Sequence, residues 1–145
     1  MKEKFKQAFM DVAERFAQLS HAERAKVGAI IVKEGRIISI GYNGMPEGMD
    51  NVCEVDGVTK AEVIHAEANA FAKLVKSNES GAGADMFVTH FPCIHCAKQI
   101  VQSGISKVYY GRDYKANVGS GHDLLDAAGI ETEKVELTSS SLSVE

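Results

Sequence analysis

The spacing of hydrophobic residues in this chain changes from the period of a helix to that of a strand and back. Between Phe5 and Leu19, apolar side chains recur at steps of three and four, which predicts an amphipathic helix that ends near Ser20. Residues 27–32 (VGAIIV) and 36–42 (RIISIGY) are instead rich in β-branched residues and flank a Lys-Glu-Gly turn, which is typical of a hairpin. The chain is therefore expected to open with a helix and two antiparallel strands.

The rest of the chain alternates the same two patterns after one long loop. Residues 43–60 are rich in Gly, Asp and Asn, and they predict an ordered loop. The segments after it are predicted, in chain order, as helix 62–76, strand 85–89, helix 93–103, strand 107–110, a helix ending at 129 and strand 131–137. This order favours a three-layer α/β/α fold, in which a mixed five-stranded sheet carries helices on both faces. We expect a single domain over residues 1–137 and a disordered tail over residues 138–145.

Composition excludes several classes of protein. The 145 residues are 45% hydrophobic and 25% charged, which is the balance of a soluble globular domain. No apolar run approaches the about 18 residues of a membrane span. The first ten residues mix charge with aromatics, so we expect no secretory signal and a cytoplasmic location. The net charge of −4 disfavours binding to nucleic acid, although a local basic pocket could still hold a small anion.

Two short segments carry the residues best suited to bind a metal. In a reducing compartment, a Cys-x-x-Cys motif such as Cys93–Cys96 indicates metal binding or redox chemistry. Cys93 and Cys96 share one face at the start of a helix, where Pro92 is well tolerated. Thiolate and imidazole are good zinc ligands, so His65 would complete a set of three. A fourth position left for water is the mark of a catalytic zinc site.

Glu67 is the candidate general acid and base. On a regular helix, residues two apart point about 200° away from each other. His65 and Glu67 can therefore face one cavity only if His65 lies at the helix start, where the geometry departs from that of a regular helix. In that arrangement Glu67 could take a proton from zinc-bound water and deliver it to a substrate.

These motifs resemble those of the cytidine deaminase superfamily and, within it, of the deoxycytidylate (dCMP) deaminases. The superfamily pattern is His65-Ala66-Glu67 followed by residues 92–96 (PCIHC). The narrower resemblance rests on residues 41–44 (GYNG), 88–98 (VTHFPCIHCAK) and 102–110 (QSGISKVYY). The resemblance implies a cytidine deaminase-like fold and the hydrolysis of dCMP to dUMP and ammonia, which supplies dUMP for thymidylate synthesis.

The resemblance also implies roles for individual residues. His65, Cys93 and Cys96 would hold Zn²⁺, and Glu67 would shuttle protons. The residues that would contact the nucleoside are Asn43 at the sugar hydroxyl, the Ala66 backbone N–H at the cytosine carbonyl and the Phe91 carbonyl at the leaving amino group. The residues that would meet the phosphate are Arg24, Tyr114 and Lys115. Arginine is more usual at the last of these positions, so a point charge stands where bidentate contact is expected.

Regulation and assembly are implied by the resemblance as well. Such deaminases are commonly homohexamers that dCTP activates and dTTP inhibits, with Mg²⁺ accompanying the regulatory triphosphate. The candidate effector-binding residues are Tyr42, Asn43 and Gly44. Many relatives have arginine after Gly-Met-Pro, where this chain has Glu47. A carboxylate that faces a triphosphate is unfavourable unless a cation intervenes.

Other interpretations remain open from the sequence. The enzyme could also act on dCTP or on a 5-substituted dCMP. A thiol–disulfide protein would use Cys93 and Cys96, but it leaves His65 and Glu67 unexplained. A structural zinc protein would need a fourth ligand, for which Cys53 is the candidate. Cys53 could equally be a free thiol or a ligand of a second metal.

Overall fold

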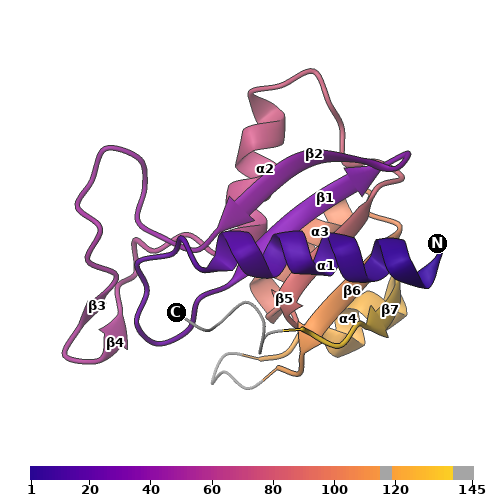
Figure 1. Cartoon of the computed structure of the whole chain (residues 1–145). Helices are drawn as coiled ribbons and strands as arrows, with labels where there is room; N and C mark the ends of the chain where they lie inside the picture. Colours follow the sequence, from indigo (N-terminus) through magenta and orange to yellow (C-terminus); the bar gives the residue numbers. More distant parts are fainter. Residues whose placement is uncertain (115–118, 139–145) are drawn as a thin grey trace.

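The helices and strands follow one another in the predicted order. The computed structural model describes residues 1–114 and 119–138. Its elements, drawn in Figure 1, are α1 (Glu3–Ala17), β1 (Gly28–Lys33), β2 (Arg36–Tyr42), β3 (Glu54–Val55), β4 (Val58–Thr59), α2 (Ala66–Val75), β5 (Asp85–His90), α3 (Ile94–Gln102), β6 (Lys107–Arg112), α4 (His122–Ala127) and β7 (Glu131–Lys134). Within these two ranges, no helix combines the length and the apolar character needed to cross a membrane.

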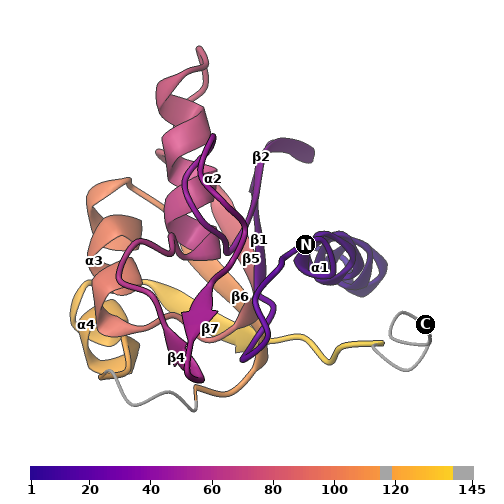
Figure 2. The same ribbon diagram turned by 90° about the vertical axis from the view of Figure 1, so that its left-hand side faces the viewer.

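Five of the strands form one mixed sheet, in the order β2-β1-β5-β6-β7. Strand β1 pairs antiparallel with both β2 and the central strand β5, whereas β5, β6 and β7 run parallel to one another. Figure 2 shows α1 on one face of the sheet and α2, α3 and α4 on the other. The predicted three-layer fold with a mixed five-stranded sheet is therefore confirmed.

Each face of the sheet has its own hydrophobic core. Because successive side chains of a strand point to opposite faces, Ile30 packs in the core under α1, and Ile31 packs under α2 and α3. The α1 side is filled by Phe87, whose ring stacks on Tyr109 with centroids 4.4 Å apart. Because both faces of the sheet are buried, the sequences of its inner strands are nearly continuous runs of apolar residues.

On each face of the sheet, one glycine lets a helix pack in direct contact with the backbone of a strand. A Cβ atom at Gly28 would overlap the carbonyl oxygen of Ala13 in α1. A Cβ atom at Gly41, one position further along the β1–β2 ladder, would overlap the carbonyl oxygen of Ala66 in α2. The first turn of α2 is therefore seated directly on the backbone of β2.

The start of α2 differs from the prediction. The helix begins at Ala66 rather than at residue 62. The residues before it are extended because Ile64 forms a short antiparallel bridge with Gly44, with N···O distances of 2.8 and 3.1 Å. This tertiary pairing overrides the local preference for helix, and it moves His65 from inside the helix to its N-cap.

The predicted loop over residues 43–60 contains a small hairpin made of β3 and β4. Its turn is Asp56-Gly57, and both residues have positive φ angles, of 53° and 76°. Asp-Gly is a preferred pair for such a two-residue turn, so the signal was present in the sequence. The last strand also ends earlier than predicted, at Lys134 instead of residue 137.

Replacing Gly41 with alanine tests the close seating of α2. We expect Gly41→Ala to lower the free energy of unfolding by about 1–3 kcal/mol, because the added methyl group has no space against Ala66. Gly44→Ala is the matched control, since nothing lies within 4 Å of the added atom. Urea unfolding of the two variants and the wild type measures the difference. Equal stability of the two variants would show that α2 is not held by this contact.

Candidate active site

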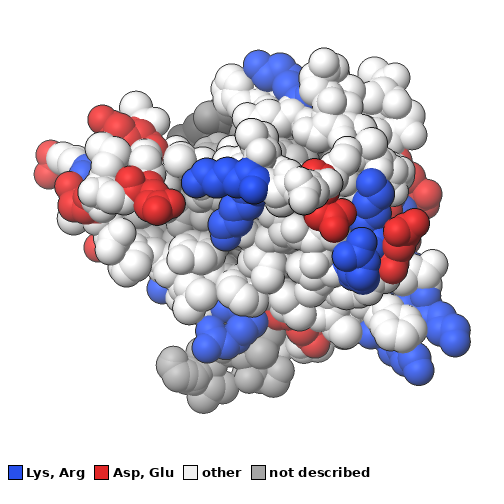
Figure 3. All heavy atoms as spheres, turned by 90° about the horizontal axis from the view of Figure 1, so that it is seen from above, with Lys and Arg blue, Asp and Glu red and all other residues white. Residues whose placement is uncertain are grey.

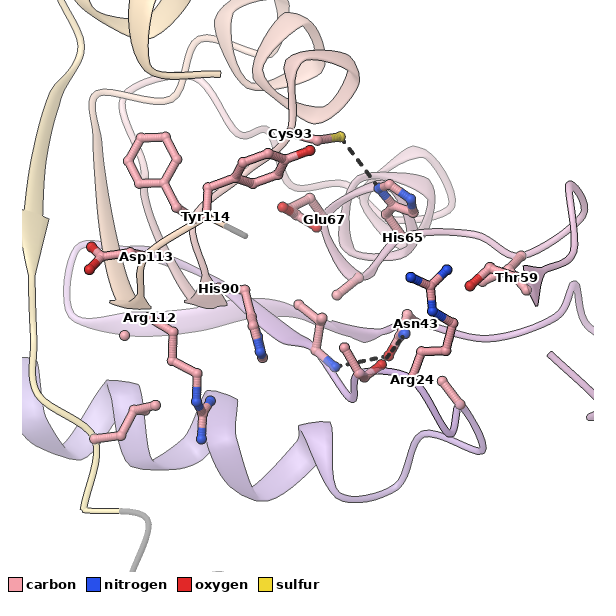
Figure 4. A pocket seen from close by; sticks show the side chains of 18 of the residues that line it. Arg24, Asn43, Thr59, His65, Glu67, His90, Cys93, Arg112, Asp113 and Tyr114 are labelled. Atoms are coloured by element: carbon pink, nitrogen blue, oxygen red, sulfur yellow. Dashed lines mark hydrogen bonds between the residues drawn. The ribbon is translucent and has the colours of Figure 1, made fainter. Parts of the chain in front are cut away.

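A cavity of about 880 Å³ opens at the carboxyl ends of β5 and β6, next to the first turns of α2 and α3. In α/β sheets, this edge is where ligands bind. The polar residues that line it and are labelled in Figure 4 are Arg24, Asn43, Thr59, His65, Glu67, His90, Cys93, Arg112, Asp113 and Tyr114. The cavity thus brings together residues from both ends of the sequence.

Three of the predicted ligands form a compact triangle. The ligand atoms of His65, Cys93 and Cys96 all lie within 4.8 Å of one another. The His65 Nδ1 atom is 3.3 Å from the Cys96 Sγ atom and 3.6 Å from the Cys93 Sγ atom. Tetrahedral zinc, with bonds of about 2.3 Å to sulfur and about 2.0–2.1 Å to nitrogen, would place such atoms about 3.5–3.6 Å apart. The three side chains therefore fit Zn²⁺.

The three ligands lie at the N-termini of helices α2 and α3. His65 is the N-cap of α2 and Cys93 is the N-cap of α3, both with extended backbone at ψ 155° and 172°. Cys96 lies in the first turn of α3, on the same face as Cys93. The position of His65 meets the geometric condition drawn from the sequence, since it lets His65 and Glu67 line the same cavity.

The two cysteines titrate as a pair. A hydrogen bond with Cys96 lowers the pKa of Cys93, and the His65 ring adds to this effect. The same hydrogen bond, together with burial, raises the pKa of Cys96. The partial positive charge at the start of α3 favours thiolate here. The surroundings therefore favour thiolate at Cys93 in particular.

Glu67 is buried beside the triangle, with only 4% of its surface exposed. Burial raises the pKa of its carboxyl group, because the charged form loses its hydration. Figure 4 shows the carboxyl group directed into the cavity, between Tyr114 and His65. A buried acid with a raised pKa next to a metal site can exchange protons with a substrate near neutral pH.

The residues predicted to contact the nucleoside also lie at the main cavity. Ala66 is the first residue of α2, whose N–H group has no partner within the helix. Phe91 lines the cavity, and its ring stacks on His122 with centroids 3.5 Å apart. The Asn43 carboxamide is engaged with the backbone: its Oδ1 atom accepts from Val27 at 2.9 Å, and its Nδ2 atom donates to Ala25 at 2.9 Å.

The predicted phosphate contacts lie on two sides of the cavity. Arg24 lines the cavity on the side of the β3–β4 hairpin. Tyr114 follows β6, and Figure 4 shows its hydroxyl group directed toward Cys93 and Glu67. Lys115 lies outside the described residues.

The predicted effector-binding residues lie around a second, smaller cavity. Tyr42, Asn43 and Gly44 line this space of about 270 Å³ together with Glu47 and Lys73. The Lys73 ammonium group already donates to the Ile40 carbonyl oxygen at 2.6 Å. Asn43 is the residue common to both cavities.

Residues outside the predicted set of site residues also line the main cavity. Arg112 ends β6 and forms an ion pair with Glu14 of α1, at 3.2 Å. His90 ends β5, and burial together with Arg112 lowers its pKa to about 4, so that the ring is neutral near pH 7. Glu54 reaches the cavity from β3. No local pattern marks these residues, because strand pairing and the folding back of the hairpin bring them to the cavity.

Cys53 does not belong to the metal triangle. Its side chain is buried, with 1% exposed, and its Sγ atom lies 3.7 Å from the carbonyl oxygen of Asn51. Within residues 1–114 and 119–138, His65, Cys93 and Cys96 are the one group of three or more potential ligands that could hold a metal ion. A role for Cys53 as fourth ligand, which a structural zinc site would need, is therefore wrong.

Comparisons with known proteins agree with this geometry. Residues 3–112 match the model of the cytidine and deoxycytidylate deaminase zinc-binding region. The fold is similar to that of the dCMP deaminase of cyanophage S-TIM5 in complex with dCMP and dUMP, with a TM-score of 0.88 and 47% identity, over 92% of this chain and 98% of that chain. The deoxycytidylate deaminase of Enterobacteria phage T4 is 35% identical, over 84% of this chain and 85% of its own length. ComE operon protein 2 of Bacillus subtilis is 41% identical, over 90% of this chain and 71% of its own length. On this evidence the chain is a member of the cytidine and deoxycytidylate deaminase family of zinc-binding proteins.

Proposed function

We propose that this protein hydrolyses dCMP to dUMP and ammonia. The observation that carries the proposal is the buried carboxyl group of Glu67 beside a triangle of three zinc-binding side chains in one cavity. Relatives named as deoxycytidylate deaminases, among them that of phage T4, support dCMP as the substrate. Activity on dCTP or on a 5-substituted dCMP is the alternative that a substrate panel distinguishes.

In this proposal, different residues of the chain carry out different parts of the reaction. A zinc ion held by His65, Cys93 and Cys96 would supply a Lewis acid that makes water reactive near neutral pH. Glu67 takes one proton from the reacting water and delivers it to N3 of the cytosine ring as the water oxygen adds to C4. It then takes the second proton of that water and passes it to the amino group, so that the C4–N bond breaks, ammonia leaves and the C4 carbonyl group of dUMP forms. Its burial suits this role, because the acid must hold a proton during part of the cycle.

Other groups orient the base and the nucleotide. The Ala66 N–H group binds the cytosine carbonyl, and the Phe91 carbonyl orients the amino group that leaves. Asn43 contacts the sugar hydroxyl, and Arg24, Tyr114 and Lys115 bind the phosphate. The position of Arg24 on the wall of the main cavity supports its phosphate role.

We propose further that the protein is a cytoplasmic homohexamer regulated by dCTP and dTTP. The second cavity, lined by Tyr42, Asn43 and Gly44, is the candidate effector site. Glu47 lines the same cavity, so a triphosphate there would need a counterion such as Mg²⁺.

Removing the charge of Glu67 tests its role in proton transfer. Glu67→Gln is expected to retain one zinc ion per chain and to lower kcat for dCMP by about 10²–10⁴-fold, because the amide cannot accept and return the proton. Zinc analysis and ammonia release measure the two effects. Glu62→Gln, at an exposed position before the helix, is the control that should keep full activity. Full turnover by Glu67→Gln would remove Glu67 from the mechanism.

The cysteines can be compared for their part in metal binding. We expect Cys93→Ala to lose stoichiometric zinc and activity, because the triangle loses a ligand. Cys53→Ala is the matched control, and it should keep one zinc ion per chain through dialysis. Zinc content after dialysis is the measurement. A wild-type protein that holds no zinc but cycles between dithiol and disulfide would support the thiol–disulfide interpretation instead.

Arg24 can be tested by comparing a nucleotide with a nucleoside. Arg24→Ala should raise KM for dCMP by about 10–100-fold with little change in kcat, because one charge-assisted contact to the phosphate is lost. Lys26→Ala removes an exposed charge two residues away and serves as the control. Steady-state kinetics on dCMP and deoxycytidine are the measurement, and an unchanged KM for dCMP would exclude the phosphate role of Arg24.

A further inference from the structure

We infer that Glu54 is a positioning residue that sets the place of Arg24 for binding of the substrate phosphate. The inference rests on the proposed function, in which Arg24 contacts that phosphate. Glu54 belongs to β3, the first strand of the small hairpin that lies beside the connection from α1 to β1 (Figure 1). It acts on Arg24 through the backbone.

The contact is made by one carboxylate oxygen. The Oε2 atom of Glu54 accepts the backbone N–H of Glu23 at 2.9 Å and the backbone N–H of Arg24 at 3.1 Å. Residues 23–26 lie outside any helix or strand, so their backbone N–H groups take no part in a helix or a sheet ladder. A side chain 30 residues further along the sequence thus binds the turn that carries Arg24.

Other hydrogen bonds hold the same connection at its two ends. At its start, the Ser20 hydroxyl donates to the Asn43 carbonyl oxygen at 2.8 Å and accepts the Ala22 N–H at 3.1 Å. At its end, the Asn43 side chain bridges Ala25 and Val27. Glu54 fixes the middle of the segment, and the backbone of Arg24 is therefore held between these anchors.

The Arg24 side chain is directed toward the cavity. Figure 4 shows its guanidinium group extending toward Thr59 and His65. In the described part of the chain, no carboxylate lies within ion-pair distance of this group. A long exposed side chain loses conformational freedom when it binds an anion, so a fixed backbone lowers the cost of binding.

Negative charge nearby makes the position of Arg24 important for binding an anion. Asp50, before the small hairpin, and Asp56, in its turn, are exposed, and Figure 3 shows acidic side chains gathered at one end of the molecule. A phosphate that enters beside the hairpin meets negative potential, which a well-placed arginine offsets. Glu54 itself lines the cavity, but two backbone N–H groups share its Oε2 atom and reduce its repulsion of an anion.

Kinetics of the zinc-loaded enzyme on dCMP test the inference. Glu54→Ala should raise KM by about tenfold and leave kcat within about twofold, because the arginine is displaced and the proton-transfer residues are not. The inhibition constant of inorganic phosphate, as a competitor, should rise by a similar factor. Glu54→Gln keeps an oxygen that can accept both N–H groups, so its KM should stay within about threefold of the wild type.

A charge control separates positioning from a general electrostatic effect. Asp56→Asn removes one negative charge from the turn of the same hairpin, and because it weakens the negative potential there, it should lower KM and the inhibition constant slightly and should raise neither. If Glu54→Gln raises KM as much as Glu54→Ala, or if Glu54→Ala lowers kcat instead of raising KM, the positioning role is overturned.

The double variant Arg24→Ala/Glu54→Ala shows whether the two residues act together. We expect its KM to equal that of Arg24→Ala, because Glu54 has no further role once the guanidinium group is gone. Independent, multiplicative effects would contradict the inference. If Arg24→Ala raises KM and Glu54→Ala does not, only the inference fails. If Arg24→Ala itself leaves KM unchanged, the proposed phosphate role fails first.

Discussion

The convergence of two helix N-termini at one edge of the sheet is the constraint on which the site depends. His65 and Cys93 both occupy N-cap positions, and Glu67 and Cys96 follow in the first turns. Short backbone bridges, Gly44 to Ile64 and Cys93 to Ser120, keep the residues before or at each helix start extended. The partial positive charge at the start of α3 favours thiolate at Cys93, whereas burial raises the pKa of Glu67, so that the two helix starts bring together an anionic sulfur and an acid that retains its proton more readily.

The two halves of the main cavity are built differently. The half around His65, Cys93 and Glu67 stands on helices packed against the sheet, and the close contact of α2 with Gly41 limits their movement. The half around Arg24 is built from connections and a two-strand hairpin, and the side chains of Asn43 and Glu54 hold it by two hydrogen bonds each. Rigid elements thus carry the proposed chemistry, whereas loops carry the recognition of the nucleotide.

Prediction from sequence succeeded where the signal was local and failed where a distant segment intervened. The periods of the strands and helices predict the three layers, and Asp56-Gly57 is a hairpin signal within the segment predicted as a loop. The start of α2 was misplaced because the pairing of Ile64 with Gly44 overrides helix propensity. Likewise, nothing near Glu54 in the sequence indicates that its carboxylate binds the backbone of Arg24.

The sequence by itself determined the chemistry that this chain can support, because ligand type and spacing are local properties: two thiols three residues apart and the segment His65-Ala66-Glu67. It also determined that the first strand would be covered on both faces, since residues 27–32 are apolar throughout. Only the tertiary structure decided that His65 caps a helix, that Cys53 stays away from the metal site and that Glu54 meets Arg24. Each of these depends on contacts between segments far apart in the sequence, whose geometry is set when the whole chain packs.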